Sequence, residues 1–274
     1  HMRRASRKIA DGELSTRVGQ KVGKRRDEIG QLATDFDEMA SRLQAMQAAN
    51  QRLLQDVSHE LRSPLARMNV ALEIARNKGT GAIDAEIDRI ALESARLETL
   101  VNDVLSLLKE SSETARRLDE DFDLSELLDD LVGVVNYEVP EGKPGIDWTS
   151  PGLVMFHGDR EHLWRAVENL LRNALRHTDP DRGVVLGLTS SKRKQEIRLS
   201  VRDFGQGLPE QELERIFEPF YRVQESRDRD SGGHGLGLSI ASTAVRRHGG
   251  GISAANAGGG GLVVEIVLPG KAGA

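Results

Sequence analysis

The sequence predicts a multi-domain protein, in which an α-helical coiled-coil and four-helix-bundle region is followed by an α+β sandwich domain. The length of 274 residues exceeds that of one small module and suits two or three domains. Apolar residues in the first half recur at steps of three and four, which is typical of packed helices. After about residue 120, short apolar runs at 153–156, 184–188, 197–201 and 262–268 alternate with helical stretches, which indicates a domain of mixed helices and strands.

Composition narrows the classes of protein to consider. Hydrophobic residues make up 38% of the chain and charged residues 30%, the proportions of a soluble globular protein. A net charge of −5 gives no overall basic surface, so nucleic acid is not an expected partner. The absence of cysteine excludes disulfides and thiolate metal sites. No apolar run approaches the ~18–20 residues that cross a bilayer.

The first long helix carries the pattern of a coiled-coil seam. Its seam positions alternate in steps of three and four and are Phe36, Met39, Leu43, Met46, Asn50, Leu53 and Val57. The polar Asn50 on this seam is expected to fix the register at some cost in stability. From Leu53 to Leu65 the steps become three fours in a row, which locally unwinds a left-handed supercoil.

A second helix after Gly79 and Gly81 predicts a helical hairpin. Its apolar stripe alternates in steps of four and three along Ile83, Ile87, Ile90, Ser94, Leu97, Val101, Val104 and Leu108. One hairpin leaves such a stripe half covered, whereas two hairpins bury it in a four-helix bundle. The sequence therefore predicts a homodimer.

His59 is the first residue with possible chemistry. It follows Val57 by two residues, which places it about 200° around the helix from the seam, on the solvent face. Glu60 follows it directly, and Pro64, which has no N–H, is expected to bend the helix. An exposed imidazole beside a carboxylate can act as a nucleophile. The alternative is an ordinary histidine on a charged face.

The residues around His59 resemble the phospho-acceptor box of sensor histidine kinases. The matching run is Ser58-His59-Glu60-Leu61-Arg62-Ser63-Pro64-Leu65. The resemblance implies that His59 accepts a phosphoryl group and that Glu60 is its general base. It also implies that Ser63, at a position where threonine is more usual, orients water for the reverse phosphatase reaction.

The second half contains four patches that could bind a ligand. Asn169 and Asn173 lie four apart on one helix face, beside Arg172 and Arg176, and such oxygen donors and cations suit Mg²⁺ and phosphate. A polar helix face without function is the alternative. Asp203-Phe204-Gly205-Gln206-Gly207 follows a strand, and its glycines allow a ligand to approach, although a simple turn would look the same.

The other two patches frame a loop. Residues 217–222 cluster aromatic side chains and end in Arg222, and a polar segment of about residues 223–231 follows. It ends in the glycines Gly233, Gly235 and Gly237, directly before a helical pattern. A glycine-rich loop that enters a helix N-terminus offers backbone N–H groups to an anion, as a lid over a triphosphate would. A flexible surface loop is the alternative.

In this order the patches are similar to the N, G1, F and G2 boxes of the histidine-kinase catalytic domain, the ATP-binding fold of gyrase-type and chaperone ATPases. The resemblance implies that Asn169 and Asn173 bind Mg²⁺ and that Asp203 reads the adenine amino group. The remaining nucleotide-binding residues that it implies are Arg176, His177, Gly205, Gly207, Arg222, Gly233, Gly235 and Gly237. Phe204 and Gln206 stand where Asn and Pro are frequent, which predicts an altered affinity.

The N-terminal segment resembles a HAMP signal-relay domain, through residues 9–18 and 27–33. Details of residues 51–65 and 217–238 are similar to the Cpx-type envelope-stress kinases. The predicted domains are a partial HAMP region at 3–50, a dimerisation and phosphotransfer hairpin at 51–112 and a catalytic ATP-binding domain at 118–270. HAMP domains usually adjoin a membrane, so we expect the cytoplasmic part of a plasma-membrane sensor.

The resemblance implies a protein-histidine kinase of a two-component system. It would use Mg-ATP to phosphorylate His59, pass the phosphoryl group to an aspartate of a response-regulator receiver domain and dephosphorylate that regulator. Two alternatives fit the same residues. One is an ATPase or chaperone on the same fold, which would not need the His-Glu pair. The other is an ATP-binding regulator that acts mainly as a phosphatase or scaffold.

Overall fold

The computed structural model describes residues 2–10, 13–18, 28–77, 83–111, 119–191, 193, 195–223 and 234–270. The chain divides between Ala66 and Arg67 into two compact units. Four predicted features lie partly or wholly outside the described residues: the HAMP-like runs at 9–18 and 27–33, the turn between the two long helices, most of the loop at 223–231, and Gly233.

The first unit begins with a small cluster around helix α1 (Met2–Ala10). Ala5, Val18 and Ala33 are buried together, with Phe36 packed against them. The backbone N–H of Val18 donates to Asp37 Oδ1 at 2.6 Å. Val18, in the first run of the predicted HAMP region, therefore lies against the start of the long helix α3 (Glu28–Asn77).

Helix α3 runs without interruption through Pro64. The middle of its predicted seam is not covered by the described residues, because Met39, Leu43 and Met46 are 47%, 40% and 67% exposed. Such exposure of large apolar side chains at heptad positions leaves a surface that favours a further helical partner.

Helix α4 (Ile83–Ser111) buries a different line of residues from the predicted stripe. The residues that are buried lie seven apart and are Glu86, Glu93, Leu100 and Leu107, whereas Ile87 and Val101 of the stripe are exposed. Arg67 on α3 donates to Glu93 Oε2 at 2.7 Å. Hydropathy could not predict these buried positions, because two of the four are glutamates. Arginine side chains neutralise the charge of both glutamates.

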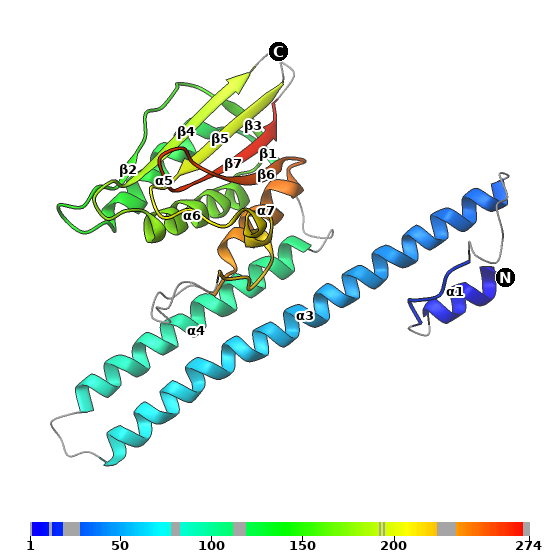
Figure 1. The fold of residues 1–274 in the computed structure, drawn as a ribbon, viewed down its shortest axis with the longest axis horizontal. Coiled ribbons are helices and arrows are strands. Elements are labelled where there is room, and N and C mark those ends of the chain that lie inside the picture. The colour runs from blue at the N-terminus through cyan, green and yellow to red at the C-terminus, as the bar shows by residue number, and fades with distance from the viewer. Residues whose placement is uncertain are drawn as a thin grey trace. The chain divides into compact units, whose positions relative to one another are not determined.

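The remaining residues form an α+β domain with two sheets (Figure 1). The larger sheet has the order β2-β4-β5-β7-β6, with β2 parallel to β4 and all other pairs antiparallel. The smaller sheet pairs β1 with β3. The elements are β1 (Asp119–Asp123), α5 (Leu124–Tyr137), β2 (Ile146–Asp147), β3 (Met155–Asp159), α6 (Arg160–His177), β4 (Val184–Ser191), β5 (Glu196–Arg202), the 3₁₀ helices η1 (Glu210–Glu212) and η2 (Arg215–Phe217), α7 (Gly237–Arg247), β6 (Gly251–Asn256) and β7 (Leu262–Pro269).

The core of this domain lies between the larger sheet and helices α5, α6 and α7, which cover one face of it (Figure 1). Alternate residues of the central strands are buried, as a half-covered sheet requires. Asp123 and Asp159 cap the N-termini of α5 and α6 by accepting hydrogen bonds from Ser125 and His162. The predicted fold class, a helical region followed by an α+β domain, is confirmed.

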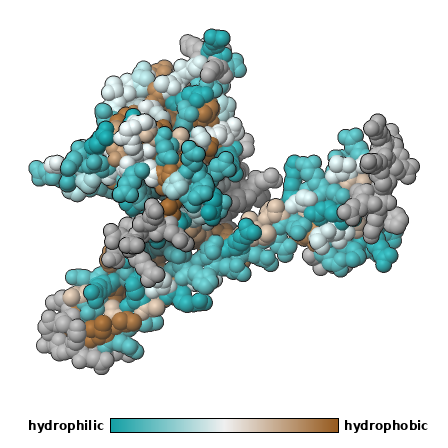
Figure 2. All heavy atoms as spheres, in the orientation of Figure 1, coloured by the Kyte–Doolittle hydropathy of each residue, from teal (hydrophilic) through white to brown (hydrophobic). Residues whose placement is uncertain are grey.

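The visible surface in Figure 2 is mostly hydrophilic, with hydrophobic residues confined to limited patches. Among the helices of the described residues, none has an apolar stretch of the length and hydropathy that a membrane span needs.

Candidate functional site

His59 lies on α3 with its side chain exposed to solvent, as its spacing from Val57 predicted. Glu60 is half-buried beside it, and Ser63, one turn further along, is exposed. Pro64 is buried at the next position. The structure therefore presents the imidazole of His59 to solvent on a continuous helix, where a reaction partner can reach it.

Helix α6 carries the predicted metal-binding amides. Asn169 donates from Nδ2 to the carbonyl oxygen of Arg165 at 2.9 Å, which leaves its Oδ1 as an acceptor. That oxygen faces the start of α7, because a Cβ built on Gly237 would lie 2.9 Å from it. Asn173 is half-buried, and its side chain forms no hydrogen bond with the described residues. Both amides can therefore offer an oxygen to a ligand.

Arg172, which the sequence placed beside these amides as a possible phosphate contact, is used in packing. Its guanidinium bonds both carboxylate oxygens of Glu138, at the end of α5, and Nε donates to Glu168 at 3.0 Å. The hydrogen bond with Glu138, followed by that with Glu168, raises the pKa of Arg172. Arg172 therefore fastens α6 to α5.

Arg176, His177 and Arg222 gather at the C-terminal end of α6. Removal from solvent, followed by the charge of Arg222, lowers the pKa of Arg176. Removal from solvent and the charge of Arg176 likewise lower the pKa of His177, against an opposing effect of Asp203. Two guanidinium groups that repel each other would be relieved by an anion. This part of the site thus suits phosphate.

Asp203 is buried at the end of β5, 7% exposed, and its carboxylate is oriented by backbone groups. Oδ1 accepts hydrogen bonds from the N–H groups of Gly205 at 2.9 Å and Leu262 at 3.1 Å. Neither bond uses Oδ2, and no other bond to that oxygen is formed by the described residues. One carboxylate oxygen is therefore held rigidly while the other can accept from an amino group.

The glycines after Asp203 are required by close packing. A Cβ on Gly205 would overlap the carbonyl oxygen of His177 at the end of α6. Gly207 has φ +73°, and a Cβ there would lie 2.7 Å from Asn256 Oδ1. Asn256 in turn accepts from the N–H of Leu208 at 2.8 Å and donates to its carbonyl at 2.7 Å. Sequence reasoning missed Asn256, because its role arises only from the fold.

The ends of the predicted lid are joined by the backbone. The N–H of Phe220 donates to the carbonyl of Gly235 at 2.9 Å, so residues on either side of 224–233 meet. Gly235 has φ +71°, and a Cβ there would lie 2.8 Å from the carbonyl oxygen of Tyr221. Arg215 stacks on the ring of Tyr221, 4.2 Å from its centroid. The aromatic patch therefore anchors both ends of the loop.

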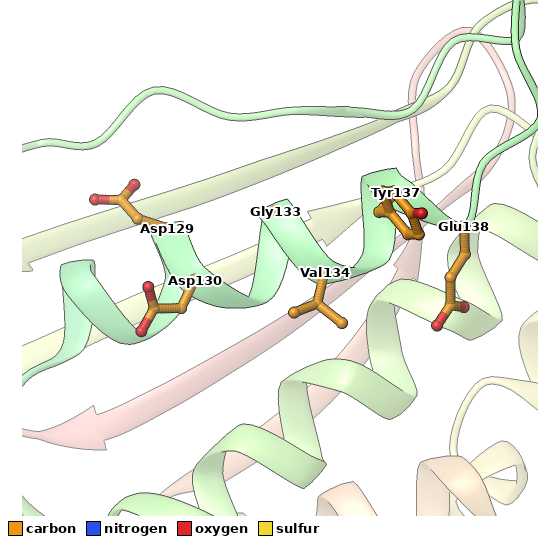
Figure 3. A pocket seen from close by; sticks show the side chains of 6 residues that line it. All are labelled: Asp129, Asp130, Gly133, Val134, Tyr137 and Glu138. Carbon is orange, nitrogen blue, oxygen red and sulfur yellow. The ribbon is translucent and has the colours of Figure 1, made fainter.

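A separate pocket lies along the outer side of α5 (Figure 3). It has a volume of about 570 Å³ and is lined by Asp129, Asp130, Gly133, Val134, Tyr137 and Glu138. None of the predicted site residues lines it. Within the described part of the chain, no group of three His, Cys, Asp or Glu residues is placed to hold a metal ion. Mg²⁺ bound by amide oxygens and by a nucleotide's phosphates fits this donor set.

Three family models match the chain in succession. Residues 1–45 match the HAMP domain and residues 49–113 the His Kinase A (phospho-acceptor) domain. Residues 158–272 match the family of histidine kinase-, DNA gyrase B-, and HSP90-like ATPases. Together the three matches span the helical region and most of the α+β domain.

A similar protein of full length agrees with the family models. The chain is 33% identical to the sensor histidine kinase CpxA of Escherichia coli K12 over 271 residues, which cover 98% of this chain and 57% of CpxA. It therefore spans little more than half the length of that relative.

Two solved structures share the fold. Full-length ShkA in complex with AMPPNP is 26% identical with a TM-score of 0.59, over 80% of this chain and 45% of ShkA. Histidine kinase ThkA in complex with the response regulator TrrA is 22% identical with a TM-score of 0.66, over 90% of this chain and 69% of ThkA. The second likeness concerns the fold alone.

Proposed function

Because the chain belongs to the sensor histidine kinase family, with HAMP, phospho-acceptor and ATPase domains in succession, we propose that it uses ATP to phosphorylate His59 and then transfers the phosphoryl group to an aspartate of a response-regulator receiver domain. The observation that carries the proposal is the convergence of the nucleotide residues. Amides on α6, the cations at its end and the oriented carboxylate of Asp203 lie on elements that touch one another through glycine contacts.

The proposed reaction is an in-line attack of neutral His59 on the γ-phosphorus of ATP. A lone pair of one ring nitrogen forms the N–P bond while the bond from phosphorus to the β,γ-bridging oxygen breaks and ADP leaves. Glu60 orients the imidazole and accepts the proton of its other ring nitrogen. The exposure of His59 allows this approach.

The nucleotide half would bind ATP through separate contacts at its two ends. Asn169 and Asn173 would hold Mg²⁺, which supplies neutralisation of charge on the transferring phosphoryl group. Arg176, His177 and Arg222 would face the phosphates, and Asp203 Oδ2 would accept from the adenine amino group. Gly233, Gly235 and Gly237 would bring the end of the lid close to the phosphates.

A homodimer is part of the proposal. The exposed seam of α3 and the exposed Ile87 and Val101 of α4 would be buried against a second copy in a four-helix bundle. The second partner that we propose is a response-regulator receiver domain, in keeping with the match to the phospho-acceptor domain and the similarity to a sensor histidine kinase. We also propose domain bounds of 3–50, 51–112 and 118–270. We further propose that the chain is the cytoplasmic part of a protein anchored in the plasma membrane.

Phosphatase activity towards the regulator is proposed for the same helix. Ser63 is exposed one turn after His59, so its hydroxyl can orient water towards a phospho-aspartate held near the imidazole. An ATP-binding regulator that works mainly in this direction would keep the same contacts.

The test is autophosphorylation of the whole chain with γ-labelled ATP and Mg²⁺. We expect an acid-labile, base-stable label that is lost in His59→Ala. His157→Ala is the matched control, because His157 is also exposed but lies on β3, and it should label normally. Label that persists in His59→Ala would place the acceptor elsewhere. Absence of label despite measured ATP binding would contradict the kinase proposal and favour the phosphatase.

A further inference from the structure

The ring of Phe204, beside the oriented Asp203, is held by two arginines. The guanidinium carbons of Arg182 and Arg202 lie 3.9 Å and 4.7 Å from the ring centroid. Both distances fall within the range of cation–π attraction. Because Phe204 is only half-buried, this contact is separate from the packing of the core.

The two arginines come from different parts of the domain. Arg182 lies in the turn between α6 and β4, and Arg202 ends β5. Arg202 Nη2 also donates to the carbonyl of Gly258, in the turn between β6 and β7, at 2.9 Å. The ring of Phe204 therefore joins two turns that are distant in the sequence.

The backbone of Phe204 is tied to α6 as well. Its N–H donates at 3.1 Å to the hydroxyl of Thr178, the residue directly after α6, and this hydroxyl donates to the carbonyl of Gly183 at 2.5 Å. On the other side, a Cβ on Gly261 would overlap the carbonyl oxygen of Asp203. The segment that carries Asp203 is thus wedged between the end of α6 and the β6–β7 turn.

We propose that Phe204 is a positioning residue for the nucleotide. Its ring, gripped by Arg182 and Arg202, fixes the distance between the carboxylate of Asp203 and the amides of Asn169 and Asn173 on α6. A ligand that must touch both ends binds well only when this distance is fixed. An Asn side chain at this position has no π face to receive a cation. This inference rests on the proposed function and names a determinant of nucleotide affinity in that site.

The test compares Phe204→Asn, Phe204→Tyr and Arg182→Met in the whole chain. We expect Phe204→Asn to weaken binding of AMPPNP with Mg²⁺ roughly five- to tenfold and to raise the KM for ATP equally, because two cation–π contacts are lost. The kcat of autophosphorylation should stay within about twofold, since no group that touches the transferred phosphoryl changes. Phe204→Tyr keeps the ring and should bind as the unchanged chain does.

The coupling between ring and cation is tested by the double variant. Phe204→Asn with Arg182→Met should bind no more weakly than Phe204→Asn alone, because the contact is already lost. Arg198→Met is the matched control, since Arg198 lies on the same strand as Arg202 and bonds Glu196 and Glu265 instead. It should leave AMPPNP binding unchanged.

The outcomes separate this inference from the proposed function. Unchanged affinity in Phe204→Asn, or equal loss in Phe204→Tyr, would overturn the positioning role while leaving the kinase intact. A drop in kcat at constant KM would also overturn it. If the unchanged chain fails to bind AMPPNP, the proposed function and this inference both fall.

Discussion

Single residues in the nucleotide half are constrained mainly by how closely backbone segments approach. Gly205 shows this most directly, since it has no left-handed backbone conformation that would by itself demand glycine. The demand comes from the carbonyl oxygen of His177, which occupies the space of a Cβ. The sequence alone was compatible with a simple turn glycine. In the structure this glycine also allows the segment of Asp203 to contact the end of α6.

Gly205→Ala should therefore separate the Asp203 segment from α6. We expect at least tenfold weaker AMPPNP binding and a loss of about 1–3 kcal/mol in unfolding free energy, as for overpacked sites. Gly258→Ala is the control, because a Cβ there meets nothing within 4 Å. Calorimetry and urea unfolding measure the two effects. Equal behaviour of both variants would show that the backbone accommodates the methyl group.

Asp159 predicts a dependence of stability on pH. Burial alone would raise the pKa of this carboxyl, but the hydrogen bonds and charge of His162, 2.6 Å away, outweigh burial and hold the pKa below its usual range. A group with a depressed folded pKa stabilises the fold above its unfolded pKa, about 3.9, and loses that contribution as pH falls through the folded value. Stability should thus decline below about pH 4.

Asp159→Asn isolates the charge, since Asn caps a helix as well as Asp does. The variant should be less stable at pH 7 and should lose less stability on acidification. Both tryptophans, Trp148 and Trp164, lie in the α+β domain, so tryptophan fluorescence in urea reports its unfolding. Parallel pH profiles for the two proteins would disprove the role of this carboxylate.

At the scale of elements, the strands that were predicted are those with alternating apolar residues. The expected runs at 184–188, 197–201 and 262–268 became β4, β5 and β7, each one to three residues longer. The run expected at 153–156 formed β3 from Met155 instead, because Val154 pairs with Leu124 at the start of α5. Strands β1, β2 and β6 were not predicted. β1 is acidic, β2 has only two residues, and β6 is rich in Gly and Ala.

Helix α5 contains a glycine, Gly133, at a position where the surrounding contacts leave room for a larger side chain. Gly133 lies in the helix interior on the side shown in Figure 3, and a Cβ there would meet nothing within 4 Å. Gly133→Ala should stabilise the domain by about 0.5–1 kcal/mol, because glycine loses more backbone freedom on folding. Urea unfolding measures the gain. A destabilised variant would mean that the helix needs the glycine for a reason absent from these contacts.

For the molecule as a whole, the sequence was most informative where functional residues lie close together in short motifs. His59 with its neighbours, and the succession of Asn, Asp and Gly patches, identified the family before any contact was known. The sequence did not predict the role of residues whose hydrogen-bond partners lie far away in the chain. Arg172 is one, because Glu138 that holds it lies 34 residues away. Asn256, 48 residues from Leu208, is another.

The exposed seam of α3 predicts how two chains assemble. Met46 is 67% exposed and lies at a heptad position, so in a dimer it would be buried against the α3 seam of the second chain. Met46→Glu would place two unpaired carboxylates in that interface, and we expect the dissociation constant of the dimer to rise at least tenfold. Sedimentation over a range of concentrations measures it.

Ala48→Glu adds the same charge two residues further on, on the opposite side of the helix from the seam, and should leave the dimer unchanged. If dimers are needed for phosphotransfer, the rate of autophosphorylation of Met46→Glu should depend on concentration in the range where the unchanged chain shows a constant rate per chain. Equal dissociation constants for the two variants would mean that the seam does not join two chains. The bundle formed by α3 beyond His59 and α4 would then have to hold the dimer alone, and substitutions at Ile87 and Val101 would carry the effect expected of Met46.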